Sequence, residues 1–214
     1  MSECIFCNLE PLREDILFET DNFFVKLGFG LTAPGHIMLV TKKHFACFAD
    51  LPENLWQEGL DLMKEISKKI ESEFGETYIT ENGIWGQSVF HAHMHFIPKI
   101  RKATYYYPSY KIKDVEKEIL IPINAKYENA DKAFLNSIRK ENKSYVLFID
   151  KEKIYYTDTK DQTVADSFIG YRKMFRDFLK IHDIPITWKN ISAELKLIDD
   201  YKRAETKRLI VFNT

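Results

Sequence analysis

Three histidines occupy alternate positions in one short segment of the chain. His91, His93 and His95 are half of the six histidines in the sequence. Residues 88–97 read as a strand, and alternate side chains of a strand share a face, so all three imidazoles are predicted on one face. Such a row offers a nucleophile or base at neutral pH, with neighbours that orient it and bind an anion. Three ordinary surface or interface histidines are the simpler alternative, but they do not explain the regular spacing.

A pair of cysteines near the start of the chain has the spacing of a metal half-site. Cys4 and Cys7 are separated by two residues, and thiolates at this spacing supply two ligands of a tetrahedral zinc site. No second such pair follows, so any further ligands are expected to be histidines, with His44 and His91 as candidates. A redox dithiol is the alternative, disfavoured because no strand is predicted before the pair and no helix directly after it. Cys47 is expected to be a small buried residue.

The elements that precede the histidines are predicted from apolar spacing and turn residues. Residues 23–26 and 37–41 read as strands, separated by a segment rich in glycine and proline. A long helix is predicted to follow and to run to Phe74, with apolar residues three, four or seven positions apart. Asp50 is the expected N-cap of this helix and Gly75 its C-terminal stop.

The second half of the chain contains further helices and strands without a strict β-α-β alternation. The predicted strands are 77–80, 145–149 and 154–157, and the predicted helices are 129–140, 163–181 and 191–203. This arrangement favours an α+β fold with an antiparallel sheet and a long helix, followed by a C-terminal α/β extension. We place the division near residue 100, with a first domain at 1–100 and an extension at 101–214 packed on it.

Composition excludes several classes of protein. The chain has 214 residues and a net charge of −1, without the basic excess expected of a dedicated duplex-DNA binder. Its apolar runs, such as residues 37–40, are far shorter than the roughly 20 residues that cross a bilayer. No signal peptide is visible at the N-terminus. We therefore expect a cytoplasmic protein that binds neither membrane nor nucleic acid.

The motifs together resemble those of the histidine triad (HIT) family. The segment His91-Ala-His93-Met-His95-Phe-Ile fits the pattern His-φ-His-φ-His-φ-φ, where φ is an apolar residue. Cys4-Ile-Phe-Cys7 is similar to the zinc half-site of many bacterial members. Pro34-Gly35-His36 with the downstream His44, and Gly86-Gln87-Ser88-Val89 before the triad, match the family in the same order. The resemblance covers about residues 3–98, and the remainder resembles a C-terminal extension.

This resemblance implies a catalytic role for two of the three triad histidines. It implies a homodimer that cleaves or transfers a nucleotide at its α-phosphate. By position, His93 is the nucleophile that forms a nucleotidyl-histidine intermediate, and His95 contacts the phosphate. Gln87 and Ser88, with the flanking Gly86 and Val89, bind the phosphate or the leaving group.

The resemblance also implies a structural zinc site beside the catalytic strand. In zinc-containing relatives the first histidine of the triad is a metal ligand, which here assigns zinc to Cys4, Cys7, His44 and His91. Zinc at this position would hold the strand and keep His93 in place. His36 is expected to lie behind the catalytic strand and to help orient it.

Two positions depart from the family pattern. Members usually have Asp or Asn eight residues before the histidine of Pro-Gly-His, where it holds the ribose, and this chain has Gly28. They often have Asn or Gln eleven residues before the first triad histidine, and this chain has Thr80. The resemblance therefore supports the phosphate chemistry more strongly than it supports the usual nucleoside recognition.

Four functions are compatible with these residues. The preferred one is a hydrolase for dinucleoside polyphosphates or nucleoside phosphoramidates. A nucleotidyltransferase is the first alternative, although uridylyl-transferring relatives usually have Gln where this chain has His95. A non-catalytic nucleotide-binding module is the second, suggested by Gly28 and Thr80. A metal-dependent enzyme whose metal is held by the triad is the third, and it leaves Cys4 and Cys7 unexplained.

Overall fold

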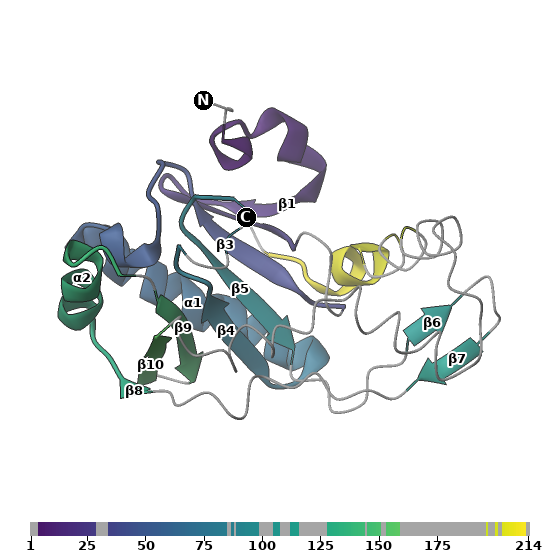
Figure 1. Ribbon diagram of the computed structural model, residues 1–214. Helices are drawn as coiled ribbons and strands as arrows, with labels where there is room; N and C mark the ends of the chain where they lie inside the picture. Colours follow the sequence, from purple (N-terminus) through teal and green to yellow (C-terminus); the bar gives the residue numbers. More distant parts are fainter. Residues whose placement is uncertain are drawn as a thin grey trace, which may run out of the picture.

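The protein is described here by a computed structural model. It describes residues 4–28, 34–84, 87, 89–98, 105–107, 112–115, 128–143, 145–150, 153–158, 196, 200 and 203–212. Its main feature is an eight-stranded sheet with the order β1-β2-β3-β5-β4-β9-β10-β8, in which all neighbouring strands are antiparallel. Figure 1 shows this sheet running diagonally through the molecule.

The strands and helices within the first hundred residues follow one another closely. Three short 3-10 segments are present: η1 (Ile5–Cys7), η2 (Glu10–Asp15) and η3 (Phe48–Asp50). The strands are β1 (Ile16–Glu19), β2 (Phe23–Leu27), β3 (Ile37–Thr41), β4 (Thr77–Glu81) and β5 (His93–Pro98). The helix α1 (Glu53–Phe74) covers one face of the sheet.

The two faces of the central strands are buried by different parts of the chain. Apolar residues of β2, β3 and β5, among them Val25, Leu39 and Met94, pack with residues of α1 in the main core. On the other face, Phe24, Met38 and Val40 form a second cluster with residues of the N-terminal segment. His93 of β5 lies on this second face, where its ring contacts Phe6 of the N-terminal segment.

Helix α1 ends as expected but begins differently. Gly75 takes φ of +80° after the last turn, and its N–H donates to the carbonyl of Glu71, which is the predicted stop. The predicted N-cap, Asp50, is wrong, because the residue before the first helical turn is Pro52 and no side chain caps the helix. Asp50 instead accepts a hydrogen bond from Arg139 Nε at 3.3 Å, which links it to the second half of the chain.

Strand β5 begins five residues later than the sequence predicted. The predicted strand started at residue 88, whereas β5 begins at His93, directly after the Ala92 carbonyl accepts a hydrogen bond from the Thr41 N–H at 3.3 Å. Its predicted alternation is confirmed, since Ala92, Met94 and Phe96 lie in the main core. His91 therefore lies before the strand, and its imidazole faces the N-terminal cysteines.

Later elements extend the same sheet. The hairpin of β9 (Tyr145–Asp150) and β10 (Lys153–Asp158) confirms the predicted pair of strands, and β9 pairs with the edge of β4. The short β8 (Glu128–Asn129) adds the last strand, and α2 (Lys132–Lys140) packs against η3. Asp131 caps α2 by accepting a hydrogen bond from the Phe134 N–H at 2.7 Å.

Two further pieces of the second half are described. Strands β6 (Tyr105–Tyr107) and β7 (Ile112–Val115) form a separate two-stranded sheet. Residues 203–209 are helical, and the segment 203–212 returns to the first half of the chain, as its yellow ribbon shows in Figure 1. The predicted helix 163–181 lies outside the described residues, as does most of the predicted helix 191–203.

Candidate active site and metal centre

His93 is held in the protonation state of a nucleophile. It is the first residue of β5, and only 5% of its surface is exposed. Its Nδ1 lies 2.6 Å from the carbonyl oxygen of His91, so Nδ1 carries the proton and donates it to that carbonyl. In a neutral imidazole the other nitrogen, Nε2, then keeps its lone pair. Burial lowers the pKa of His93 and the nearby ammonium of Lys26 adds to this, against the hydrogen bond to the His91 carbonyl, so the neutral form of the ring is favoured.

His95 and His36 form a hydrogen-bonded pair beside His93. The ring centroids of His93 and His95 are 4.9 Å apart, and His36 Nε2 lies 3.1 Å from His95 Nδ1. Burial, together with His93, His36 and Lys26, lowers the pKa of His95 well below its usual value. If His36 donates through Nε2, His95 accepts at Nδ1, and its own Nε2–H can donate to an anion.

The ring of His36 also occupies the space beside Gly28. A Cβ built on Gly28 would lie 2.7 Å from the Cε1 and Nδ1 atoms of His36, closer than side-chain atoms approach one another. The backbone of the two residues is also joined, since the Gly28 N–H donates to the His36 carbonyl at 3.1 Å. A carboxylate at this position, as in the family pattern, cannot coexist with this placement of His36.

Thr80, the second departure from the pattern, is engaged elsewhere. Its hydroxyl donates to the carbonyl oxygen of Leu147 in β9 at 2.9 Å. Thr80 is also directly opposite His95 in β5 and Phe148 in β9. Its side chain therefore connects β4 to the later strands.

The residues before the triad are only partly described. Gln87 is 7% exposed, and both polar atoms of its amide are buried without a hydrogen-bond partner among the residues that the structure describes. A buried amide in this state is unusual in a native protein unless it has a ligand or water to bind. Val89 packs against the N-terminal apolar cluster, and its carbonyl accepts from the His91 N–H at 2.9 Å. Gly86 and Ser88 lie outside the described residues.

The four predicted zinc ligands meet at one point. The ligand atoms of Cys4, Cys7, His44 and His91 all lie within 4.8 Å of one another, and the described residues contain no other such group. His91 Nδ1 is 3.4 Å from Cys4 Sγ and 3.6 Å from Cys7 Sγ, while His44 Nδ1 is 3.4 Å from Cys7 Sγ. These separations match the ~3.6 Å between sulfur and nitrogen ligands that bond lengths of about 2.3 and 2.0 Å give around a tetrahedral zinc.

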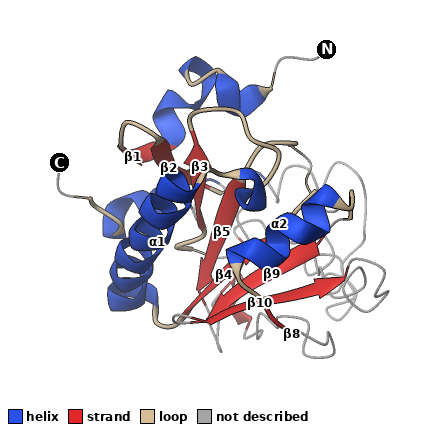
Figure 2. Cartoon of the chain, turned by 90° about the vertical axis from the view of Figure 1, so that its left-hand side faces the viewer, coloured by secondary structure: helices blue, strands red, loops and turns tan. Residues whose placement is uncertain are grey.

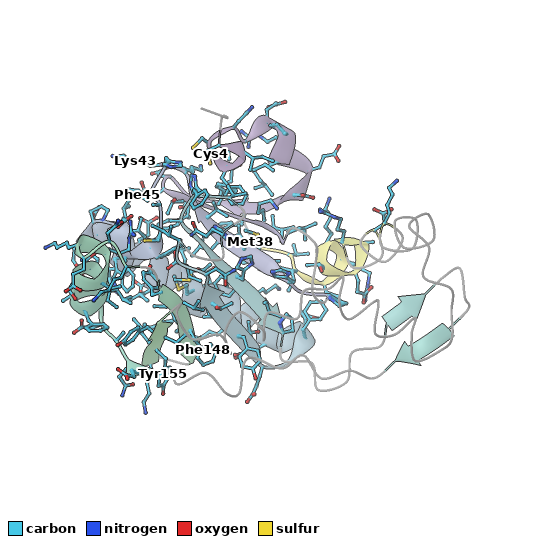
Figure 3. All side chains as sticks on the ribbon, in the orientation of Figure 1. Cys4, Met38, Lys43, Phe45, Phe148 and Tyr155 are labelled. Atoms are coloured by element: carbon cyan, nitrogen blue, oxygen red, sulfur yellow. The ribbon has the colours of Figure 1, made fainter. Side chains whose placement is uncertain are left out.

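The surroundings of His91 also suit a metal ligand. Its Nε2 lies 2.6 Å from the carbonyl oxygen of Thr41, so Nε2 carries the proton and Nδ1 faces the two sulfurs with its lone pair. Burial lowers the pKa of His91 to about 4, which keeps the imidazole neutral. Burial and the neighbouring Cys4 raise the pKa of the Cys7 thiol, a cost that a bound cation removes. Figure 3 shows Cys4 next to the loop that carries Lys43 and Phe45.

Phe6 connects the cysteine pair with the two histidine groups. It is fully buried between Cys4 and Cys7, and its ring meets His91 and His93 edge to face, at centroid distances of 5.7 and 5.5 Å. The N-terminal turn therefore touches both the candidate metal ligands and the candidate nucleophile.

Two functional features were not predicted from the sequence. Lys26 is completely buried on β2, donates to the Leu27 carbonyl and lies 3.8 Å from an oxygen of Asp15. Burial lowers its pKa to about 8, yet it adds positive potential near the triad. The sequence feature that could have predicted this burial is a single lysine within the otherwise apolar run 23–27. Thr41, which holds His91 through its carbonyl, gives no such signal.

Cys47 is buried, as predicted, and it lies beside a buried polar cluster formed by Glu81 and Tyr145. Glu81 accepts hydrogen bonds from the Phe48 N–H at 2.7 Å and from the Tyr145 hydroxyl at 2.6 Å. The Ala49 N–H donates to the same hydroxyl at 3.2 Å. This group joins β4, the segment after His44, and β9, so it supports the loop that carries one metal ligand.

The fold and the site define a class of α+β proteins with a row of histidines at the start of a central strand of an antiparallel sheet. Within that class, the model of the HIT domain matches residues 11–102. A HIT protein of Bacillus subtilis is 30% identical over 107 residues, which cover 46% of this chain and 72% of the relative. The chain belongs to the HIT family.

Two fungal relatives have names that state an activity. The adenosine 5'-monophosphoramidase of Schizosaccharomyces pombe is 32% identical over 100 residues, 45% of this chain and 74% of the relative. The enzyme of the same name from Saccharomyces cerevisiae is 29% identical over 100 residues and is covered over 62% of its length. Among solved structures, a histidine triad nucleotide-binding protein of Sulfolobus tokodaii has a TM-score of 0.43 at 23% identity, over 64% of this chain and 87% of that one.

Proposed function

We propose that this protein hydrolyses nucleotides at the α-phosphate, through a covalent intermediate on His93. The observation that carries the proposal is the hydrogen bond from His93 Nδ1 to the His91 carbonyl, which leaves Nε2 as a neutral nucleophile. A neutral imidazole suits this role because it can approach an anionic phosphorus without charge repulsion. Phosphoramidates and dinucleoside polyphosphates are the proposed substrate classes, and the names of the two fungal relatives favour the first of them.

In the first step, Nε2 of His93 forms a bond to the α-phosphorus, and the bond from phosphorus to the leaving group breaks with its electron pair. In the second step, water attacks the phosphorus and the bond to Nε2 breaks. Over both steps, water supplies the hydroxyl of the nucleoside monophosphate and the proton of the leaving group. His95 donates to a phosphoryl oxygen through Nε2–H, and the buried Gln87 amide supplies a further donor.

We further propose a structural zinc ion held by Cys4, Cys7, His44 and His91. The donor set and the S–N separations support it. With four protein ligands the ion has no open position, so its contribution is to fix the N-terminal turn and His91, whose carbonyl orients His93. The third alternative, a metal held by the triad, loses support because His93 and His95 are not in the metal-ligand group found among the described residues.

The cellular location and the oligomeric state are also proposals. A cytoplasmic location agrees with thiol ligands that must remain reduced. Among the described helices, none is both long and apolar enough to span a membrane. For a homodimer, the edge of β4 is already paired with β9, so a second copy would have to use another surface, such as the edges at β1 or β8. Light scattering of the purified protein measures this directly.

The test of the proposed hydrolase is turnover with a trapped intermediate. Zinc-loaded protein is incubated with adenosine 5'-phosphoramidate and with diadenosine polyphosphates, and intact mass is measured after an alkaline quench. We expect turnover and a transient mass increase equal to one nucleoside monophosphate, both absent in His93→Ala. Met94→Leu is the matched control, since it alters the same strand on the opposite face with little change of volume.

The rival functions give different results in the same assay. Adding orthophosphate or sugar phosphates would yield new nucleotide products if the enzyme is a transferase. Tight nucleotide binding without an adduct or turnover would indicate a binding module. Either outcome, or no turnover of any substrate, overturns the hydrolase proposal.

A further inference from the structure

The C-terminal segment returns to the residues that hold the triad. Thr206, in the helical residues 203–209, is completely buried, and its Oγ1 accepts a hydrogen bond from the Gly35 N–H at 2.8 Å. The two residues are 171 positions apart in the sequence. Gly35 directly precedes His36, whose ring is hydrogen-bonded to His95. The contact is therefore only one residue away from the histidine pair.

The backbone around Gly35 is closely packed on its other sides as well. Gly35 takes φ of +83°, and a Cβ there would lie 2.6 Å from the Phe74 ring and 2.9 Å from Pro98. His36 is fixed on its other side by Gly28, whose N–H donates to the His36 carbonyl. Because a buried N–H requires a hydrogen-bond partner, the Thr206 hydroxyl satisfies the Gly35 amide, which lies before the first residue of β3.

Thr206 is itself held by neighbours on the same segment. Its carbonyl accepts from the Ile210 N–H at 2.8 Å, and Ile210 lies in the main core. Three residues before Thr206, Arg203 is paired with Asp15, and Phe212 stacks on Phe18 of β1 at 5.4 Å. Contacts before and after Thr206 in the sequence therefore hold its hydroxyl next to the Gly35 amide.

We propose that Thr206 is a positioning residue for the triad, acting through Gly35 and His36 on His95. It does not touch the reacting atoms. It fixes the backbone of Gly35, which sets the ring of His36 and so the orientation in which His95 presents Nε2–H to the phosphate. The expected kinetic effect of this contact rests on the proposed function. The C-terminal segment would then help to position the triad.

The test compares Thr206→Val, which keeps the shape but removes the acceptor, with Thr206→Ser, which retains the hydroxyl. For Thr206→Val we expect kcat to fall about tenfold with little change in KM, because small errors of alignment affect the transition state most. Thr206→Ser should recover most of kcat. Lys207→Ala, an exposed change on the same helix, should leave kcat unchanged.

A second control separates positioning from stability. Ile210→Val weakens the anchoring of the same segment in the core without touching Gly35. We expect it to lower the melting temperature at least as much as Thr206→Val while leaving kcat within twofold of the wild type. A wild-type kcat in Thr206→Val, or an equal loss of kcat in both variants, would overturn the proposal.

A readout that needs no turnover keeps this inference distinct from the hydrolase proposal. NMR of protein with labelled histidine detects the imidazole proton shared by His36 and His95, which is protected in the described geometry. We expect this signal in the wild type and in Thr206→Ser, and its loss or exchange broadening in Thr206→Val. An unchanged signal in Thr206→Val contradicts the positioning role, even if no substrate is ever turned over.

Discussion

At the scale of single residues, the site depends on hydrogen bonds that select one tautomer of each histidine. His91 and His93 each donate to a backbone carbonyl through one ring nitrogen. The other nitrogen faces the sulfurs in His91 and keeps its lone pair in His93. Two residues that take no part in the chemistry support the surrounding structure. Gly28 leaves room for the His36 ring, and the carboxyl group of Glu81 binds two donors from different elements.

Gly28→Ala is expected to impair catalysis because the added Cβ would overlap the His36 ring. The ring must move away from His95, so kcat should fall by about tenfold or more, whereas overall folding is retained. Steady-state kinetics and a melting curve measure the two effects. Normal kcat would show that His36 does not need its observed position.

Glu81 should make the stability of the protein depend on pH. Burial raises the pKa of Glu81 to about 7, with Asp50 adding to the shift, while hydrogen bonds from Tyr145 and Phe48 oppose it. A raised pKa in the folded state means that the carboxyl group is most stabilising when protonated. That stability is present below the unfolded pKa of 4.5 and is lost as pH rises toward 7.

Urea unfolding of the wild type and Glu81→Gln at pH 4.5 to 8 tests this expectation. The wild type should lose up to about 3 kcal/mol relative to the variant over this range, at about 1.4 kcal/mol per pKa unit. A difference between the two proteins that does not change with pH would show that Glu81 titrates normally.

At the scale of elements, short segments far apart in the sequence are joined at the two ends of the triad. The candidate zinc site links η1 to the loop after β3 and to His91, two residues before β5. At the other end, residues 203–209 hold the turn before β3. Strand β5 is thus fixed from both sides, although it has only six residues.

Removal of zinc is expected to loosen the N-terminal turn and the start of β5 together. Cys7→Ser should reduce bound zinc from about one ion per chain to a small fraction and lower the melting temperature. Elemental analysis and calorimetry measure both. Cys47→Ser is the control, because Cys47 is buried outside the group and should not alter the zinc content. Full zinc content in Cys7→Ser would contradict the assigned ligands.

At the scale of the whole molecule, the two halves of the chain share one sheet and one core. Strand β9 pairs with β4, and Leu135, Tyr145 and Leu147 of the later segment lie in the core that α1 covers. Gly83 allows this approach, because a Cβ there would lie 2.1 Å from the Tyr145 carbonyl oxygen. Figure 2 shows the β9–β10 hairpin continuing the sheet beyond β4, with α2 beside it. Phe148 and Tyr155, labelled in Figure 3, are neighbours on this hairpin, with ring centroids 6.1 Å apart.

The division at residue 100 remains a prediction, and truncation tests it. A chain ending at residue 100 would expose the edge of β4 and apolar core surface that residues 135–149 cover. An unpaired edge strand promotes association. We therefore expect the truncated protein to aggregate or self-associate in size-exclusion chromatography. A stable, monomeric and zinc-binding fragment would show instead that the first hundred residues form an independent domain.

The sequence by itself determined the candidate site residues and most local elements. Strand alternation separated His93 and His95 from Met94, and the Gly75 stop of the long helix followed from local backbone preferences. These features could be predicted because they depend on residues close together in the chain. The four metal-ligand candidates were available from residue type and family resemblance.

Only the tertiary structure decided the contacts made across long separations. It placed His36 over Gly28, turned Thr80 toward β9, buried Lys26 beside the triad and brought Thr206 to Gly35. A threonine 171 positions away has no local pattern that marks it. Its role arises because the buried Gly35 amide needs an acceptor, and only the folded chain determines which residue supplies one.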